Sequence, residues 1–139
     1  MRYCINPNCP NPQNPDSEER CQACNSQLLL NGRFWVTREP VAERALGNQD
    51  VAKIFEITDG NTAKILKVLY DTDANAVQRL EREAKVLIEL TNRNCLGVPK
   101  VEPELKNVLF SIQLSNTSGL VKCLVMEKIE GMNLQEWMA

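Results

Sequence analysis

The chain has 139 residues, with 16 basic and 18 acidic side chains and a formal net charge of −2. This length suits one domain, or one domain with a small appendage. The hydrophobic fraction of 43% and the charged fraction of 24% are close to globular averages and exclude wholesale disorder. No basic patch or stripe is visible, so we expect no nucleic-acid partner.

Targeting signals are missing from the sequence. No apolar run is long enough for a transmembrane helix, and Met1-Arg2-Tyr3-Cys4 lacks the apolar stretch of a signal peptide. We therefore expect a cytoplasmic protein with no membrane partner. The chain also has no histidine, which excludes Ser-His-Asp and Cys-His catalysis and every metal site that contains histidine.

Four of the six cysteines lie near the N-terminus, in two closely spaced pairs: Cys4 with Cys9, and Cys21 with Cys24. Such pairs bring two sulfurs from each of two tight turns to one Zn²⁺ ion, and a site filled by four protein ligands is structural. Residues 1–26 have almost no apolar side chains, so this segment needs a cross-link such as a bound metal ion, or it stays disordered. Two disulfides, or four free thiols, are the alternatives, but a reducing cytosol favours the metal.

The composition changes near residue 26, which divides the chain into a cysteine module (1–27), a connector (28–45) and a second unit (46–139). In the connector, the apolar stretches 28–30 and 34–36 are suited to docking it onto the second unit. The two isolated cysteines, Cys95 and Cys123, are expected to be small buried hydrophobic side chains.

The second unit has the pattern of an α+β domain. Strands are predicted at 51–57 and 62–70, joined by a hairpin turn at Asp59-Gly60, and at 108–114 and 122–128, joined by a turn at 116–119. Helical spacing of apolar residues predicts a helix over 74–92, with Thr72 or Asp73 as its N-cap, and a short helix over 133–138.

One lysine and one glutamate interrupt the apolar faces of this unit. The alternation of the strand places Lys67 on the same face as Ala63, Ile65 and Leu69. Glu83 falls within the apolar stripe of the helix 74–92. A charge on an apolar face has to pair, bind something or reach solvent, so we predict an ion pair between Lys67 and Glu83. Alternatively, Lys67 lies on a solvated edge and Glu83 pairs with Arg79 on its own helix.

Three segments together, 64–69, 79–87 and 124–131, resemble the N-terminal lobe of bacterial Ser/Thr protein kinases. The cysteine pairs followed by Leu28-Leu29-Leu30 and Gly32-Arg33-Phe34 resemble the prefix of some cyanobacterial kinases of this class. The resemblance implies a five-stranded antiparallel sheet with one main helix. It also implies that the full-length protein phosphorylates protein Ser/Thr with ATP and Mg²⁺, while zinc in the prefix is structural or regulatory.

Specific residues follow from the same resemblance. Lys67 matches the lysine that holds the α- and β-phosphates of ATP, and Glu83 matches the helix glutamate that orients it. Met126 matches the gatekeeper behind the adenine, and Glu127 and Ile129 match two hinge positions. Asn133 matches a neighbour of the ribose, and Gly47 matches the first glycine of the phosphate loop.

The sequence also departs from the family pattern. Where the family has G-x-G-x-x-G, residues 47–52 keep only the first glycine, with Gln49 and Ala52 at the other two positions, and Ile65 replaces the usual alanine above the adenine. His-Arg-Asp and Asp-Phe-Gly are both absent. We therefore expect this chain to be inactive alone and to need the larger kinase lobe as its partner, with self-association through the surface left uncovered.

Two functions of other classes remain open. One is a non-catalytic, pseudokinase-like adaptor that binds a protein partner through the zinc module. The other is a redox sensor, in which oxidation of the four clustered cysteines releases zinc.

Overall fold

The computed structural model describes residues 1–46, 50–70, 74–114 and 120–128 of the chain. Its elements, in chain order, are β1 (Arg2–Tyr3), β2 (Gln13–Asn14), β3 (Trp35–Val36), β4 (Ala42–Leu46), β5 (Asp50–Thr58), β6 (Ala63–Leu69), α1 (Ala74–Asn92), α2 (Leu105–Val108), β7 (Leu109–Gln113) and β8 (Leu120–Glu127). The prediction of an α+β fold with one main helix is therefore confirmed.

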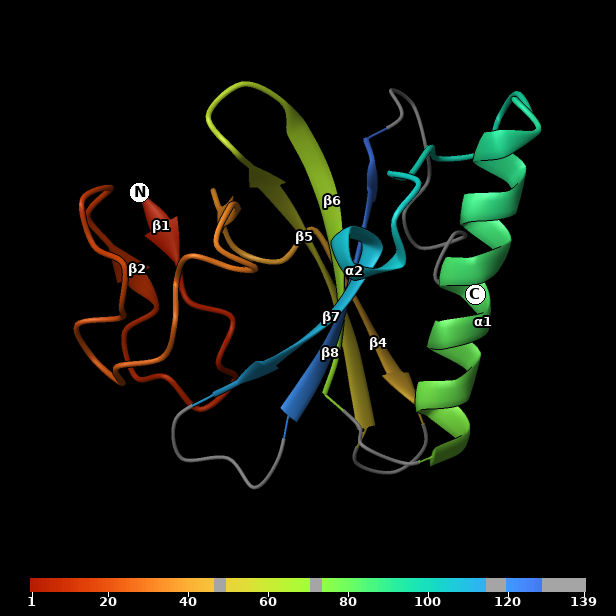
Figure 1. The fold of residues 1–139 in the computed structure, drawn as a ribbon. Helices are drawn as coiled ribbons and strands as arrows, with labels where there is room; N and C mark the ends of the chain where they lie inside the picture. Colours follow the sequence, from red (N-terminus) through yellow and green to blue (C-terminus); the bar gives the residue numbers. More distant parts are fainter. Residues whose placement is uncertain (47–49, 71–73, 115–119, 129–139) are drawn as a thin grey trace.

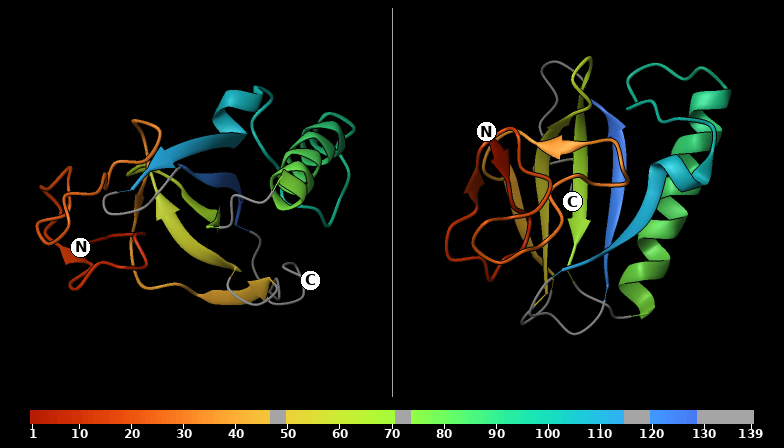
Figure 2. Two further views of the ribbon diagram at one scale, coloured as in Figure 1. Left: turned by 90° about the horizontal axis from the view of Figure 1, so that it is seen from below. Right: turned by 60° about the vertical axis from the view of Figure 1, so that its left-hand side comes forward.

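The strands form one antiparallel sheet in the order β2-β1-β3-β5-β6-β8-β7. Strand β4 also pairs with β5, so β3 and β4 share the edge of β5 opposite β6. In Figure 1 the cysteine-containing segment, which includes β1 and β2, and helix α1 lie on opposite sides of the central strands β5, β6 and β8. The sheet is curled, which is clearest in Figure 2.

The five strands β4 to β8 match the number predicted for the second unit, but the sheet extends beyond them, because the described residues form eight strands. The extra strands come from segments with no visible alternation. Strands β1 and β2 belong to the cysteine module, and Tyr3 of β1 pairs with Val36 of β3. The predicted connector contributes β3 and most of β4, so the sheet continues from the module into the second unit.

The predicted hairpin is present between β5 and β6. Gly60 has a φ of +96°, and the side chain of Asp59 accepts hydrogen bonds of 2.9 Å from the backbone N–H groups of Asn61 and Thr62. A carboxylate that binds the backbone two and three residues ahead stabilises the turn locally. The turn sets the register of β6, the strand that carries Lys67.

Helix α1 covers one face of the sheet, and its span confirms the prediction of a helix over 74–92. The apolar stripe of the helix packs on the sheet through Leu80, Ala84 and Leu87. The same core contains these buried residues of the sheet: Ile54, Ile65, Leu69, Leu124 and Met126. The predicted strands 108–114 and 122–128 are present as β7 and β8, whereas the short helix α2 before β7 was not predicted.

The opposite face of the sheet has its own core, and residues of the predicted connector help to form it. Leu30, Phe34 and Val36 pack there against Leu66 and other buried residues of the sheet. The expected docking of the connector is thus confirmed. Cys123 is fully buried in this core as predicted, but Cys95 is only partly buried.

Some expectations concern residues outside the described ranges: the helix N-cap at Thr72 or Asp73, the turn 116–119 and the helix 133–138. Within the described ranges, no helix combines the length and the apolar character that crossing a bilayer requires.

Candidate functional site

Two tight turns present the four clustered cysteines. In the first, the backbone N–H of Cys9 donates to the carbonyl of Asn6 over 3.1 Å. In the second, the N–H of Asn25 donates to the carbonyl of Cys21 over 2.8 Å, and Asn25 has a φ of +64°. Asparagine tolerates this left-handed conformation better than most residues, which explains its place directly after Cys24.

The four sulfurs form a compact group. The Sγ atoms of Cys4 and Cys24 are 3.6 Å apart, those of Cys9 and Cys21 are 3.5 Å apart, and all four lie within 4.8 Å of one another. A tetrahedral zinc site with bonds of about 2.3 Å has sulfurs separated by about 3.8 Å. No disulfide joins any of the six cysteines in the structure. The cluster has the dimensions of a site for one metal ion.

The cysteines are also the interior of their own module. The module's small core consists of Cys4, Cys21 and Leu28, with Cys9 and Cys24 packed against it. The small size of this core agrees with the expectation that residues 1–26 cannot build an apolar core without a cross-link. A metal bound to these sulfurs would therefore contribute directly to the folding free energy of the module.

The surroundings of the sulfurs shift their pKa values in opposite directions. Burial raises the pKa of Cys4 well above the usual thiol range and raises the pKa of Cys9 to about 11. Burial also raises the pKa of Cys21, but hydrogen bonds from the backbone of Cys24 and from the side chain of Asn14 outweigh it and lower that pKa to about 6. At neutral pH, a metal ion has to displace protons from Cys4 and Cys9.

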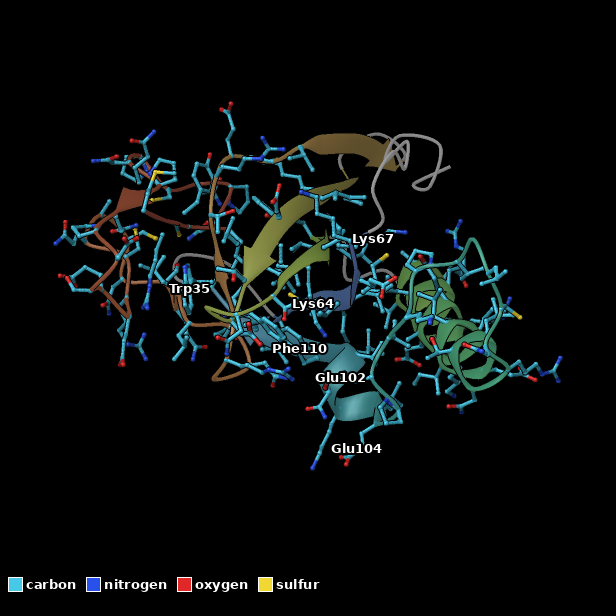
Figure 3. The ribbon with its side chains drawn as sticks, turned by 90° about the horizontal axis from the view of Figure 1, so that it is seen from above. Trp35, Lys64, Lys67, Glu102, Glu104 and Phe110 are labelled. Carbon is cyan, nitrogen blue, oxygen red and sulfur yellow. The ribbon has the colours of Figure 1, made fainter. Side chains whose placement is uncertain are left out.

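Lys67 and Glu83 form a second group, between the sheet and the helix. The Nζ atom of Lys67 on β6 is 3.0 Å from the Oε2 atom of Glu83 on α1, which confirms the predicted ion pair. Figure 3 shows Lys67 between the sheet and α1. The Lys67 side chain is 14% exposed and that of Glu83 is 26% exposed, so both remain accessible to a ligand. Arg79, the alternative partner, donates to the carbonyl of Asn75.

Apolar residues surround Lys67 on the central strands. In register, Lys67 lies between Ile54 of β5 and Leu124 of β8, and Ile65 lies opposite Met126. All four neighbours are buried, with exposed fractions of 1% or less. The ammonium group of Lys67 is therefore flanked by buried apolar side chains on this face of the sheet. Met126 is close to Lys67 in this arrangement, whereas Gly47, Ile129 and Asn133 lie outside the described residues.

The loop after α1 holds the end of β8, which the sequence pattern did not reveal. The backbone N–H of Glu127 donates to the carbonyl of Lys100 over 2.8 Å. The next residue in the loop, Val101, donates its N–H to the hydroxyl of Thr91 on α1 over 3.0 Å. The end of α1 and the residue predicted as a hinge position are thus connected through two successive loop residues.

The predicted connector reaches the same loop through charged side chains. The Nη1 atom of Arg33 is 2.6 Å from the Oε1 atom of Glu102, and its Nη2 atom is 3.6 Å from the Oδ2 atom of Asp59. The Nζ atom of Lys64 is 3.6 Å from the same Oε1 atom of Glu102. Lys64 and Glu102 are labelled in Figure 3. Because these charges neutralise one another, we assign this group a structural role in joining the connector to the loop.

These observations define the class of the protein. It is an α+β protein in which one main helix covers an antiparallel sheet, a Lys–Glu pair lies between the helix and the sheet, and four cysteines cluster near the N-terminus. Serine/threonine-protein kinase B of Synechocystis sp. is similar in sequence, with 29% identity over 100 residues. The similar region covers 62% of this chain and 17% of that kinase, so the chain spans a small part of its relative's length. No protein-family model and no solved structure matches the chain.

Proposed function

We propose that this chain is the nucleotide-binding lobe of a Ser/Thr protein kinase and contributes to ATP-dependent phosphorylation in the full-length protein. The observation that carries the proposal is the 3.0 Å ion pair between Lys67 and Glu83, set between a curled antiparallel sheet and its one main helix. The sequence similarity to a bacterial Ser/Thr protein kinase supports it independently.

In this proposal, the ammonium group of Lys67 binds the phosphates of the nucleotide and Glu83 holds the lysine in place. The buried face around Lys67 contacts the adenine, with Met126 behind it. The backbone of Glu127 and Ile129 binds the adenine edge, Asn133 lies near the ribose, and Gly47 lies in the phosphate loop. The remaining catalytic groups come from the larger kinase lobe, which is the proposed partner.

The four-cysteine cluster is proposed to bind Zn²⁺ in a structural role. Four thiolates and the sulfur separations of 3.5 and 3.6 Å fit tetrahedral zinc, and the site leaves no position open for a substrate. The module is proposed to dock a protein partner or to regulate the lobe.

Nucleotide binding tests the first proposal. Titration of the chain with ATP and with adenosine should show tighter binding of ATP, because only ATP reaches the lysine with its phosphates. A hydrogen bond to a charged group contributes about 1.5–3 kcal/mol, so Lys67→Met should weaken ATP binding by about 10- to 100-fold. The affinity for adenosine should change little.

Lys85 provides a matched control, since it is an exposed lysine on α1. Lys85→Met removes the same charge and should leave the affinity for ATP unchanged. Equal affinities for ATP and adenosine, or equal effects of the two substitutions, would contradict the proposal and favour the non-catalytic adaptor. In the full-length protein, Lys67→Met should also abolish most phosphorylation while Lys85→Met should not.

A further inference from the structure

The buried polar side chains of the described residues gather around the sulfur cluster. They are Asn6, Asn14 and Ser26, which are 4%, 4% and 1% exposed. All three belong to the cysteine module, and all three lie within hydrogen-bonding distance of a cysteine sulfur. Burying a polar group without a hydrogen-bond partner costs free energy, so the position of these three side chains beside the sulfurs needs a physical reason.

Asn6 and Ser26 act together at one sulfur. The Nδ2 atom of Asn6 lies 3.7 Å from the Sγ of Cys24 and 3.1 Å from the Oγ of Ser26. The Oγ of Ser26 is in turn 3.2 Å from the same sulfur. When Cys24 is a thiol it is the donor to Ser26, but a hydroxyl can rotate and donate to the sulfur once Cys24 becomes a thiolate.

Asn14 serves a second sulfur. Its Nδ2 atom lies 3.5 Å from the Sγ of Cys21 and 3.1 Å from the carbonyl of Pro12. The two amide hydrogens can therefore serve one sulfur and one carbonyl.

Backbone groups determine which end of each amide faces the sulfurs. The Oδ1 atom of Asn6 accepts the N–H of Asn8 over 3.0 Å, and the Oδ1 atom of Asn14 accepts the N–H of Gln22 over 2.9 Å. Since only oxygen can accept these hydrogen bonds, the NH₂ end of each side chain has to point toward the cluster. The orientation is thus set by the fold of the module.

Hydrogen-bond donors of this kind stabilise a metal-loaded cluster more than they stabilise a group of neutral thiols. Four thiolates around a dication carry a net negative charge, and burying such a charge is unfavourable without donors. N–H and O–H groups directed at the sulfurs stabilise the thiolate form, whereas neutral thiols have little need of them. Hydrogen bonds around a metal site also orient the ligands.

We propose that Asn6, Asn14 and Ser26 form a donor set that directs N–H and O–H groups at the sulfurs of Cys21 and Cys24, strengthens metal binding by the cluster and lowers the reactivity of these two sulfurs when they are bound. The inference rests on the proposed metal site. It makes these residues positioning residues, which act through the sulfurs without contacting the metal. Because a stabilised thiolate is a weaker nucleophile, the donor set should also slow the attack of electrophiles on the loaded site.

Asn14→Asp is the sharpest test. The substitution keeps an oxygen for the N–H of Gln22 but replaces the N–H donor that faces Cys21. Asn11→Asp is the control, because Asn11 is exposed in the same module and gains the same charge. Ser26→Ala removes a donor without adding a charge, which separates the loss of a hydrogen bond from repulsion.

Metal affinity of the full chain is measured by titration with Co²⁺, followed by its thiolate absorption, and by competition for Zn²⁺ with a chromophoric chelator. Loss of such outer hydrogen bonds typically weakens metal binding by about 10- to 100-fold, so we expect this for Asn14→Asp and about 10-fold for Ser26→Ala. Asn11→Asp should bind like the unchanged chain. The zinc-loaded Ser26→Ala variant should also react faster with iodoacetamide.

The outcomes separate the two proposals. If the unchanged chain binds neither Co²⁺ nor Zn²⁺, the proposed metal site and the donor set are both wrong. If the unchanged chain binds metal and both variants bind it as tightly as Asn11→Asp does, the metal site stands and the donor set is wrong.

Discussion

Lys67 and Glu83 are 16 residues apart in the sequence, and their side chains meet at 3.0 Å across the gap between β6 and α1. Each charge lies among apolar residues of its own element, with Ile65 and Leu69 beside Lys67 and Leu80 and Leu87 beside Glu83. The pair therefore links the position of the helix to the centre of the sheet.

Replacing Glu83 with Gln should weaken ATP binding although Lys67 is retained. Without its carboxylate partner, the lysine has no charge to hold it over the face of the sheet. We expect a loss of about 10-fold, the effect of one hydrogen bond to a charged group. Glu89→Gln, on the exposed side of the same helix, is the control. Calorimetric titration measures both, and equal affinities would argue against a positioning role for Glu83.

Metal removal should unfold the cysteine module and leave the rest of the sheet intact. The core of the module consists of Cys4, Cys21 and Leu28, whereas the sheet has two extended apolar cores of its own. After chelation, hydrogen exchange should accelerate at the amides of Cys4 and Cys21, which donate to Pro12 and Ser26. Amides in β6 should stay protected, and added Zn²⁺ should restore the module. Unchanged protection after complete chelation would show that the module folds without metal.

Metal affinity should fall as the pH is lowered. The pKa values of Cys4 and Cys9 are raised by burial, the latter to about 11, so both thiols have to lose protons on binding at neutral pH. These two displaced protons alone weaken binding by about 100-fold for each unit of decreasing pH. The pKa of Cys21 is lowered to about 6, so its proton adds to the competition only below that pH. Chelator competition across this range measures the slope, and a flat profile would contradict the assignment of the ligands.

Replacing Phe34 with Ala should destabilise the whole sheet. Phe34 comes from the predicted connector, is 1% exposed and packs in the core with Leu66 and Val68. Such a truncation typically costs about 3–5 kcal/mol in the free energy of unfolding. Leu96→Ala is the control, because Leu96 is 92% exposed and a surface change costs within about 0.5 kcal/mol. Urea denaturation measures both, and equal stabilities would mean that the connector contributes nothing to the fold.

Strongly periodic elements were predictable from the sequence, and weak or very short ones were not. Helix α1 has a regular apolar stripe, and the hairpin has Asp59 and Gly60 at its turn, so both were predicted close to their observed bounds. Strands β1, β2 and β3 have two residues each, which is too few for any period to show. They are strands because of their pairing: β3 pairs with the long strand β5, and Tyr3 of β1 pairs with Val36 of β3.

The sequence by itself determined the features that depend on local spacing. The intervals between the cysteines place two sulfurs in each of two turns, and the alternation of β6 places Lys67 on an apolar face. Tertiary structure alone decided which distant groups meet: Arg33 with Glu102, Glu127 with Lys100, and Asn14 with Cys21. Periodicity in the sequence indicates which face of a helix or strand is buried. It does not indicate which distant group a polar side chain on that element will contact, because that depends on how the elements pack.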